Sequence, residues 1–164
     1  MVIHGWNIYF HSCFETQLNH LLVDVQDAVL RRPEDYRGTN AFKRLAAVAT
    51  LAFDQIPRDP TDSRYRQGDT LGSNRKHWFR AKFFQQYRLF FRYSEAQRVI
   101  VYGWVNDDDT LRARGSKTDA YATFARMLAN GEPPDGWKQL LAAVIEENET
   151  QALTDQVNAI RENP

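Results

Sequence analysis

The sequence predicts an α+β fold in which a small, mostly antiparallel sheet is flanked by helices, in the order β-α-α-β-β-β-α-α. Three segments in the middle of the 164-residue chain are rich in aromatic and β-branched residues, and the first two interleave them with Arg or Lys, as half-buried strands do. The short loops between these segments favour an antiparallel meander. Segments with apolar residues at helical spacing stand before and after them, so we expect helices to pack against the sheet.

The elements before the meander are a strand and two helices. Residues 5–10 alternate and predict a first strand, which we expect to join the sheet. Apolar residues at helical spacing predict one helix over about 15–30 and a second over 42–56. Pro57 ends the second helix because proline cannot continue it.

The meander and two further helices complete the order. Its strands are predicted at 78–83, 87–93 and 99–105. Thr118 is a suitable N-cap for the helix that follows, whose apolar residues from Ala120 onward line one face. The fourth helix is expected to begin after a turn rich in glycine and proline.

A chain of this length can bury a core of its own, and we assign residues 1–150 to a single domain. Residues 151–164 are predicted to be a polar C-terminal tail or a helix extension. The single cysteine, Cys13, excludes an internal disulfide and a multi-cysteine zinc site. The sequence has no run of 18 apolar residues and no signal-peptide pattern, so we expect a cytoplasmic protein without membrane contact.

No metal or other cofactor is expected. The acidic run Asp107–Asp109 fits a solvated turn better than a cation site, because it offers too few correctly spaced oxygen ligands. The histidines show no metal-ligand spacing.

Positive charge is concentrated in the middle of the chain. The net charge of the whole sequence is zero, but residues 64–117 carry twelve basic and five acidic side chains. Between Thr70 and Ser94 there are six basic residues and no acidic one. Such a distribution indicates an anionic partner, and phosphate is the anion that we expect.

Strand geometry predicts where these cations gather. Residues i and i+2 of a strand share a face, so Arg80 and Lys82 point together, as do Arg88 and Arg92. Neighbouring strands lie roughly 5 Å apart, so two to four of these cations can converge on one phosphate. Other candidates lie close in sequence: Arg75, Lys76 and His77 before the meander, and Arg112, Arg114, Lys117 and Tyr121 after it.

Aromatic residues among these cations would suit stacking on unpaired bases. The aromatic candidates for stacking are Trp78, Tyr87, Phe90 and Tyr93. The apolar residues assigned instead to the core are Phe79, Phe83, Leu89 and Phe91. Three functions fit these patterns: a nuclease, a non-catalytic single-stranded nucleic-acid-binding domain, and a module whose basic face docks an acidic protein.

Several motifs resemble the YhaV family of type II toxins, which belongs to the RelE-like toxin superfamily. The motifs are Tyr87–Ser94, Gly103–Asp107, Thr110–Arg112 and Gly115–Tyr121. The similarity runs from Gly5-Trp6 to the segment 131–137, and the last 15 or so residues have no counterpart. The resemblance implies an antiparallel sheet flanked by helices and an endoribonuclease, or mRNA interferase, that inhibits translation, often with the ribosome. The implied partner is a PrlF-like antitoxin.

The resemblance also implies site residues. RelE-like toxins place two basic residues on the strand after the helical pair, where Arg80 and Lys82 stand. They place an arginine in a Tyr-Arg-Leu context on the next strand, which Arg88 matches. The further basic residue after the last strand is one of Arg112, Arg114 and Lys117, and the best match for their C-terminal tyrosine is Tyr121.

RNA can be cleaved without a metal, because its own 2′-OH attacks the adjacent phosphate. The enzyme then needs a base, an acid and cations for the charge that develops on phosphorus. We assign stabilisation of this charge to Arg88 and to Arg112 or Arg114. Lys82 is the candidate base, and Lys117 or Tyr121 is the candidate acid. The residues expected to contact RNA are Arg75, Lys76, His77, Arg92 and Arg114.

Overall fold

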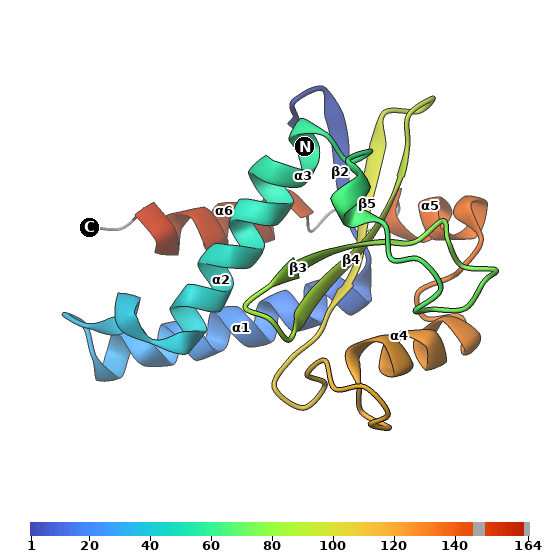
Figure 1. Cartoon of the computed structure of the whole chain (residues 1–164). Helices are drawn as coiled ribbons and strands as arrows, with labels where there is room; N and C mark the ends of the chain where they lie inside the picture. Colours follow the sequence, from blue (N-terminus) through green and yellow to red (C-terminus); the bar gives the residue numbers. More distant parts are fainter. Residues whose placement is uncertain (146–149, 163–164) are drawn as a thin grey trace.

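The computed structural model describes residues 1–145 and 150–162, in which five strands form one mixed sheet with helices on both faces (Figure 1). The strands are β1 (Val2–Ile3), β2 (Trp6–Phe10), β3 (Phe79–Phe83), β4 (Tyr87–Ser94) and β5 (Val99–Val105). The longer helices are α1 (Ser12–Arg31), α2 (Asn40–Thr50), α4 (Ala120–Ala129), α5 (Trp137–Ile145) and α6 (Thr150–Glu162). The shorter helical segments are η1 (Tyr36–Gly38), η2 (Leu51–Gln55), α3 (Ile56–Arg58) and η3 (Ser63–Tyr65).

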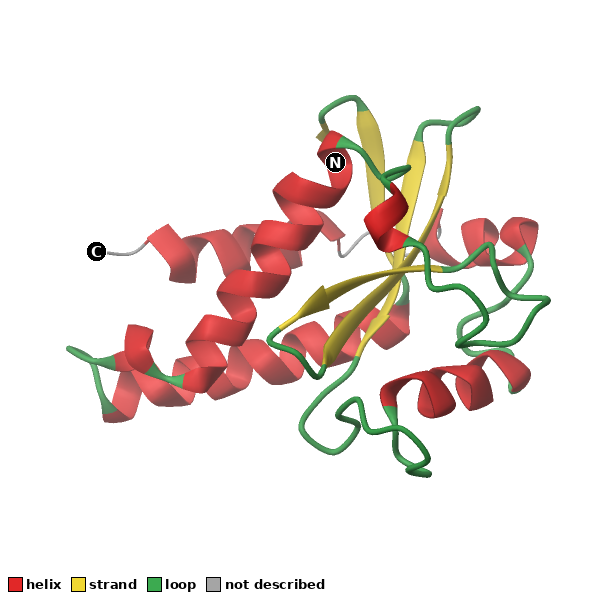
Figure 2. Ribbon diagram, in the orientation of Figure 1, coloured by secondary structure: helices red, strands yellow, loops and turns green. Residues whose placement is uncertain are grey.

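The α+β class is confirmed, and so is the antiparallel meander of β3, β4 and β5. The strand order across the sheet is β1-β2-β5-β4-β3. After β2, helices α1 and α2 carry the chain to the far edge of the sheet, and the meander then returns to pair β5 with β2 (Figure 2). This pairing is parallel, so the sheet is mixed rather than wholly antiparallel. The N-terminal strand joins the sheet as expected.

Both faces of the sheet are buried. One core lies between the sheet and α1, α2 and α6, and it takes Ile100 and Tyr102 from β5. The second core lies between the sheet and α4 and α5, and it takes Val99 and Val101 from the same strand. Every residue of β5 is therefore buried, as in a strand covered on both sides.

This second layer corrects the expectation that Trp78 and Phe90 are available for stacking on bases. Both rings are 0% exposed, because Phe124 of α4 packs against them with ring centroids 5.0 and 4.3 Å away. Of the residues assigned to the core, Leu89 and Phe91 are fully buried. The remaining members of both sets, Tyr87, Tyr93, Phe79 and Phe83, are partly buried.

The predicted helices form with small shifts at their ends. The N-cap of α4 is Asp119 rather than Thr118, because the carboxylate of Asp119 accepts hydrogen bonds from the first turn. The second predicted helix is α2, which continues through the π-helical turn η2 into α3. Among the helices of the described ranges, none combines the length and the apolar character that crossing a bilayer requires.

The last described segment is the helix α6. Its Leu153 and Val157 are buried in the core that α1 and α2 share with the sheet. The hydroxyl of Thr150 accepts a hydrogen bond from the backbone N–H of Phe10, at 3.2 Å. The predicted C-terminal tail, residues 151–164, ends with Asn163 and Pro164. These two residues lie outside the described part of the chain.

A β-bulge interrupts the pairing of β4 and β5. Phe90 pairs with Trp104 and Phe91 pairs with Tyr102, so Gly103 is an extra residue in β5. The ring of Trp78 covers this position: a Cβ atom on Gly103 would lie 2.7 Å from its Cζ3. A side chain at the bulge is thus incompatible with the buried tryptophan.

We expect Gly103→Ala to lower the free energy of unfolding by about 1–3 kcal/mol, because the added methyl group overpacks the core against Trp78. Urea denaturation measures this effect. Gly38→Ala is the matched control, since its Cβ would meet its nearest neighbour at an ordinary 3.4 Å. Equal stability of the two variants would contradict the packing argument.

Candidate active site at an arginine–tyrosine cluster

Arg80, Arg88 and Arg112 surround the side chain of Tyr121, and we call these four residues the arginine–tyrosine cluster. The Tyr121 hydroxyl accepts hydrogen bonds from Nε of Arg80 and Nε of Arg88, each at 3.0 Å. The guanidinium of Arg112 lies over the ring of Tyr121, 4.7 Å from its centroid. Four of the six predicted catalytic residues are therefore brought together.

Strand alternation and helix capping build the cluster. Arg80 of β3 and Arg88 of β4 share the face of the sheet that α4 covers, since Arg80 pairs with Phe90 of that face. Asp119 starts α4 and so fixes Tyr121 in its first turn. The ring of Tyr121 packs edge-on against Phe90 at 5.6 Å, which holds the hydroxyl between the two strands.

Asp119 joins Arg112 to the start of α4. Its Oδ1 accepts hydrogen bonds from Nη1 of Arg112 at 2.7 Å and from the N–H of Ala113 at 2.8 Å. Its Oδ2 accepts from the N–H groups of Tyr121 and Ala122. Burial alone would raise the pKa of Asp119, but the hydrogen bonds from Arg112 and the backbone outweigh it and lower the pKa.

Asn106 holds the β3–β4 turn against the loop after β5. Its Oδ1 accepts a hydrogen bond from the N–H of Arg88 at 2.7 Å. Its Nδ2 donates to the carbonyl oxygens of Gln86 and Thr110, at 3.0 and 2.8 Å. The N–H of Arg112 donates to the same Gln86 carbonyl at 2.9 Å, so the backbones that carry both arginines are fixed to each other.

Asp119 and Asn106 were not among the predicted site residues. A signal was present in the sequence, since both are polar residues directly beside strongly apolar elements. Their positions relative to the arginines follow from contacts between distant segments, which residue spacing alone does not reveal.

The arginines of the two strands keep donors for a ligand. Arg80 uses Nη1 for the carbonyl oxygen of Arg64 at 2.8 Å, and Arg88 uses Nη1 for those of Gln85 and Tyr87. Within the described part of the chain, Nη2 of Arg80 and Nη2 of Arg88 have no protein acceptor. Neither of these two nitrogen atoms is buried without a hydrogen-bond partner. Both Nη2 groups therefore reach solvent, although the side chains as a whole are mostly buried.

Lys82, Arg114 and Lys117 are exposed and lie outside the cluster. Lys82 pairs in register with Arg88 at the end of β3, so it borders the cluster on the free edge of the sheet. Arg114 and Lys117 lie in the loop that leads into α4.

A second group of predicted RNA-binding residues gathers around Asp135. Nε2 of His77 lies 2.8 Å from Oδ1 of Asp135, and Nη1 of Arg92 donates to its carbonyl oxygen at 2.5 Å. Arg75 is 3.9 Å from the other carboxylate oxygen. Burial alone would raise the pKa of Asp135, but hydrogen bonds from His77 and Trp78 outweigh it and lower the pKa.

These contacts give most of the predicted RNA-binding side chains a partner within the protein. Lys76, another of the predicted RNA-binding residues, has its Nζ 3.4 Å from Oδ1 of Asp69. Trp78 Nε1 also donates to Oδ1 of Asp135 at 2.8 Å, so this carboxylate anchors a buried core ring. The arrangement around Asp135 thus fastens the segment before β3 to the loop before α5.

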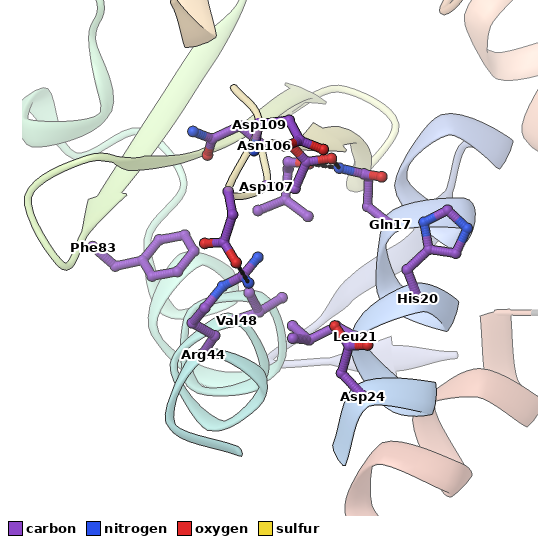
Figure 3. A pocket seen from close by; sticks show the side chains of 12 residues that line it. Gln17, His20, Leu21, Asp24, Arg44, Val48, Phe83, Asn106, Asp107 and Asp109 are labelled. Atoms are coloured by element: carbon purple, nitrogen blue, oxygen red, sulfur yellow. Dashed lines mark hydrogen bonds and ion pairs between the residues drawn. The ribbon is translucent and has the colours of Figure 1, made fainter. Parts of the chain in front are cut away.

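The acidic run after β5 lines a cavity of about 410 Å³ beside α1 and α2 (Figure 3). Gln17 of α1 donates to Oδ2 of Asp107 at 3.0 Å, and Thr110 donates to its Oδ1 at 2.8 Å. Arg44 of α2 lies 3.4 Å from Oδ2 of Asp108. These contacts organise the turn, so Asp107 in particular is already occupied by protein donors.

His11, Cys13 and Glu132 also lie close together, with their possible ligand atoms within 4.8 Å of one another. Nδ1 of His11 accepts the N–H of Cys13 at 3.1 Å and so caps α1. In a neutral ring the proton then resides on Nε2, which faces Glu132 at 3.9 Å. Burial lowers the pKa of His11 more than Glu132 raises it, and this neutral tautomer has no free nitrogen for a metal.

We expect Asp119→Asn to lower the free energy of unfolding by about 1–3 kcal/mol at neutral pH, because Arg112 loses a charged acceptor. The pKa of Asp119 is lowered from 3.8 in the folded chain, so its stabilisation is fully present above that value. It is lost as the pH falls through the folded-state pKa. Denaturation of both proteins across pH 7 to 3 should show their difference shrinking in acid.

Glu34→Gln, at an exposed position, is the matched control and should not change the stability. A difference between wild type and Asp119→Asn that stays constant down to pH 3 would contradict the assigned role of the carboxylate.

Comparison with known proteins places the chain in a family. The family model described as "Toxin with endonuclease activity, of toxin-antitoxin system" (Toxin_YhaV) matches residues 8–145. The "Ribonuclease toxin YhaV" of Escherichia coli K12 is 43% identical over 140 residues, which cover 84% of this chain and 91% of that protein. The "Toxin YhaV" proteins of E. coli O157:H7 and O6:H1 give the same identity and coverage.

No solved structure gives a significant match to the chain. The matched residues 8–145 include β3 to β5, α4 and the whole arginine–tyrosine cluster. This chain belongs to the YhaV family of toxins with endonuclease activity.

Proposed function

We propose that this protein is the ribonuclease toxin of a toxin–antitoxin pair and that it cleaves RNA without a metal, by attack of a 2′-OH on the adjacent phosphate. Family membership supports the activity, and the arginine–tyrosine cluster supports the chemistry. The observation that carries the proposal is that Arg80 and Arg88 share one tyrosine acceptor while each keeps Nη2 open to solvent. A phosphate group provides the acceptors that such donors lack.

The arginines are the groups that stabilise the charge which develops on phosphorus. Arginine N–H groups grip phosphate oxygens through charge-assisted hydrogen bonds, and one well-aimed donor contributes about 3–4 kcal/mol to the transition state. Contact with the Tyr121 ring favours Arg112 over Arg114 as the third cation. Its bond to Asp119 fixes the guanidinium before RNA binds.

Tyr121 is the proposed acid. The hydroxyl oxygen has two lone pairs, and the Nε–H groups of Arg80 and Arg88 occupy both. The tyrosine O–H is left to donate, so it can protonate the departing 5′-oxygen of the RNA. Lys117, which is exposed in the loop before α4, is the other candidate for this role.

Lys82 is the proposed base that accepts the proton of the 2′-OH. Its position opposite Arg88 at the edge of the sheet puts it beside the cluster, and its exposed side chain has room to approach the ribose. The RNA is proposed to be mRNA in the cytoplasm, with the ribosome as a possible site of cleavage. A PrlF-like antitoxin is the proposed neutralising partner.

We expect Tyr121→Phe to reduce the rate of RNA cleavage by roughly 100- to 1,000-fold, because the proton donor and the acceptor that aligns both arginines are lost together. Arg88→Lys should have a similar effect, since lysine keeps the charge but not the planar fork. Cleavage of a labelled RNA by the purified protein measures the rates, and circular dichroism checks that the variants fold.

Lys138→Ala removes an exposed cation of α5 and should cleave at the wild-type rate. The cut RNA should end in a 2′,3′-cyclic phosphate or a 3′-phosphate, as attack by the 2′-OH requires. Wild-type protein that binds RNA and leaves it whole would identify a binding domain instead. Dependence of cleavage on added metal would refute the proposed chemistry.

A further inference from the structure

The turn between β3 and β4 holds an aromatic side chain in an unfavourable backbone conformation. Phe84 and Gln85 have φ angles of +44° and +64°, in the left-handed region that suits glycine or asparagine. A bulky residue there is rare, and Phe84 is 54% exposed. Its described ring contact is an edge contact with the neighbouring Phe83 at 5.7 Å. The stability of the turn therefore does not explain the choice of phenylalanine.

This turn is attached directly to the arginine–tyrosine cluster. The carbonyl oxygen of Gln85 accepts a hydrogen bond from Nη1 of Arg88 at 2.8 Å. The carbonyl oxygen of Gln86 accepts from the N–H of Arg112 and from Nδ2 of Asn106. The backbone of the turn that carries Phe84 is thus held at a fixed place relative to the arginines.

Cations flank the exposed ring. Phe84 borders a groove of about 440 Å³ between α2 and the end of β3, where Lys43 and Lys82 are exposed. Phe84 also lines a smaller cavity, together with Lys43, Arg44 and Asp108. Asp108 is engaged there by Arg44 and by the hydroxyl of Tyr87, so the acid does not offset the lysines.

Lys82 connects this groove with the cluster. It pairs in register with Arg88, and it also lines the groove beside Phe84. β3 is an edge strand, and in the described residues its outer side pairs with the chain at Phe79 alone, through a bridge to Arg66. A strand of RNA that leaves the arginines can therefore cross the free end of β3 and reach the ring.

We propose that Phe84 stacks on a nucleobase of the bound RNA next to the cleaved phosphate, while Lys43 contacts a flanking phosphate and Lys82 remains the proposed base. A flat exposed ring between cations is the chemistry that binds single-stranded nucleic acid. The inference rests on the proposed function, since it takes the arginine–tyrosine cluster as the place of cleavage. It accounts for an aromatic residue at a position where the backbone favours a smaller one.

The test compares Phe84→Asn with Phe84→Trp. Asparagine accepts a positive φ, so Phe84→Asn should be as stable as wild type or more stable, yet its kcat/KM for RNA cleavage should fall roughly 5- to 150-fold, mainly through KM. Phe84→Trp should keep near wild-type cleavage, because tryptophan also stacks. Leu30→Asn, at an exposed apolar position at the end of α1, is the control and should change neither quantity.

Three results would overturn the inference. The first is wild-type cleavage by Phe84→Asn. The second is a loss of stability and cleavage in both variants, which would give the ring a structural role. The third is an unchanged KM together with escape from the antitoxin, which would make the ring part of a protein-binding surface.

Failure of the proposed function is separable from failure of this inference. Binding of an RNA oligonucleotide with a 2′-deoxy sugar at the cut site requires no chemistry, and Phe84→Asn should bind it roughly 5- to 150-fold more weakly than wild type. A wild type that never cuts RNA but shows this binding difference would refute the nuclease and retain the stacking ring.

Discussion

A shared acceptor allows positive charge to collect inside this fold. Two guanidinium groups on neighbouring strands repel each other and lose hydration when a helix covers them. The hydroxyl of Tyr121 offsets part of that cost, because it takes one N–H from each arginine and fixes their spacing. Backbone carbonyls of Arg64 and Gln85 accept further donors. The positive charge that these acceptors do not offset is directed at solvent, where it favours the binding of an anion.

Rigid support distinguishes this cluster from an ordinary basic surface. Asp119 holds Arg112 and starts the helix that carries the tyrosine, while Asn106 ties the backbone of Arg88 to the following loop. The side chains of Asp119 and Asn106 are buried, so breaking their hydrogen bonds costs more free energy than it would at the surface. Charge that is oriented before the substrate arrives needs little rearrangement during the reaction, which is the condition for electrostatic catalysis.

The periodicity of the sequence was sufficient to predict most of the elements and the meander, because side chains alternate along strands and recur every 3.6 residues along helices. It did not predict that a helix covers the face with the arginines. Arg80 and Arg88 are buried, although arginines on alternating strand positions indicate a face exposed to solvent. It also could not pair His77 and Arg92 with Asp135, which lies 58 and 43 residues away along the chain. Such partners depend on how α4 and α5 pack, and local patterns do not encode that.

The extra residue in β5 has a consequence for the face of the sheet that α4 covers. Side chains of a strand alternate between the two cores, and one inserted position reverses that alternation for everything after it. Trp104 consequently faces the same side as Val101 instead of the opposite one, and its ring lies parallel to that of Phe124 at 5.8 Å. That stacked surface is where α4 docks, so the bulge gives Phe124 a second aromatic ring beside Phe90 to pack against.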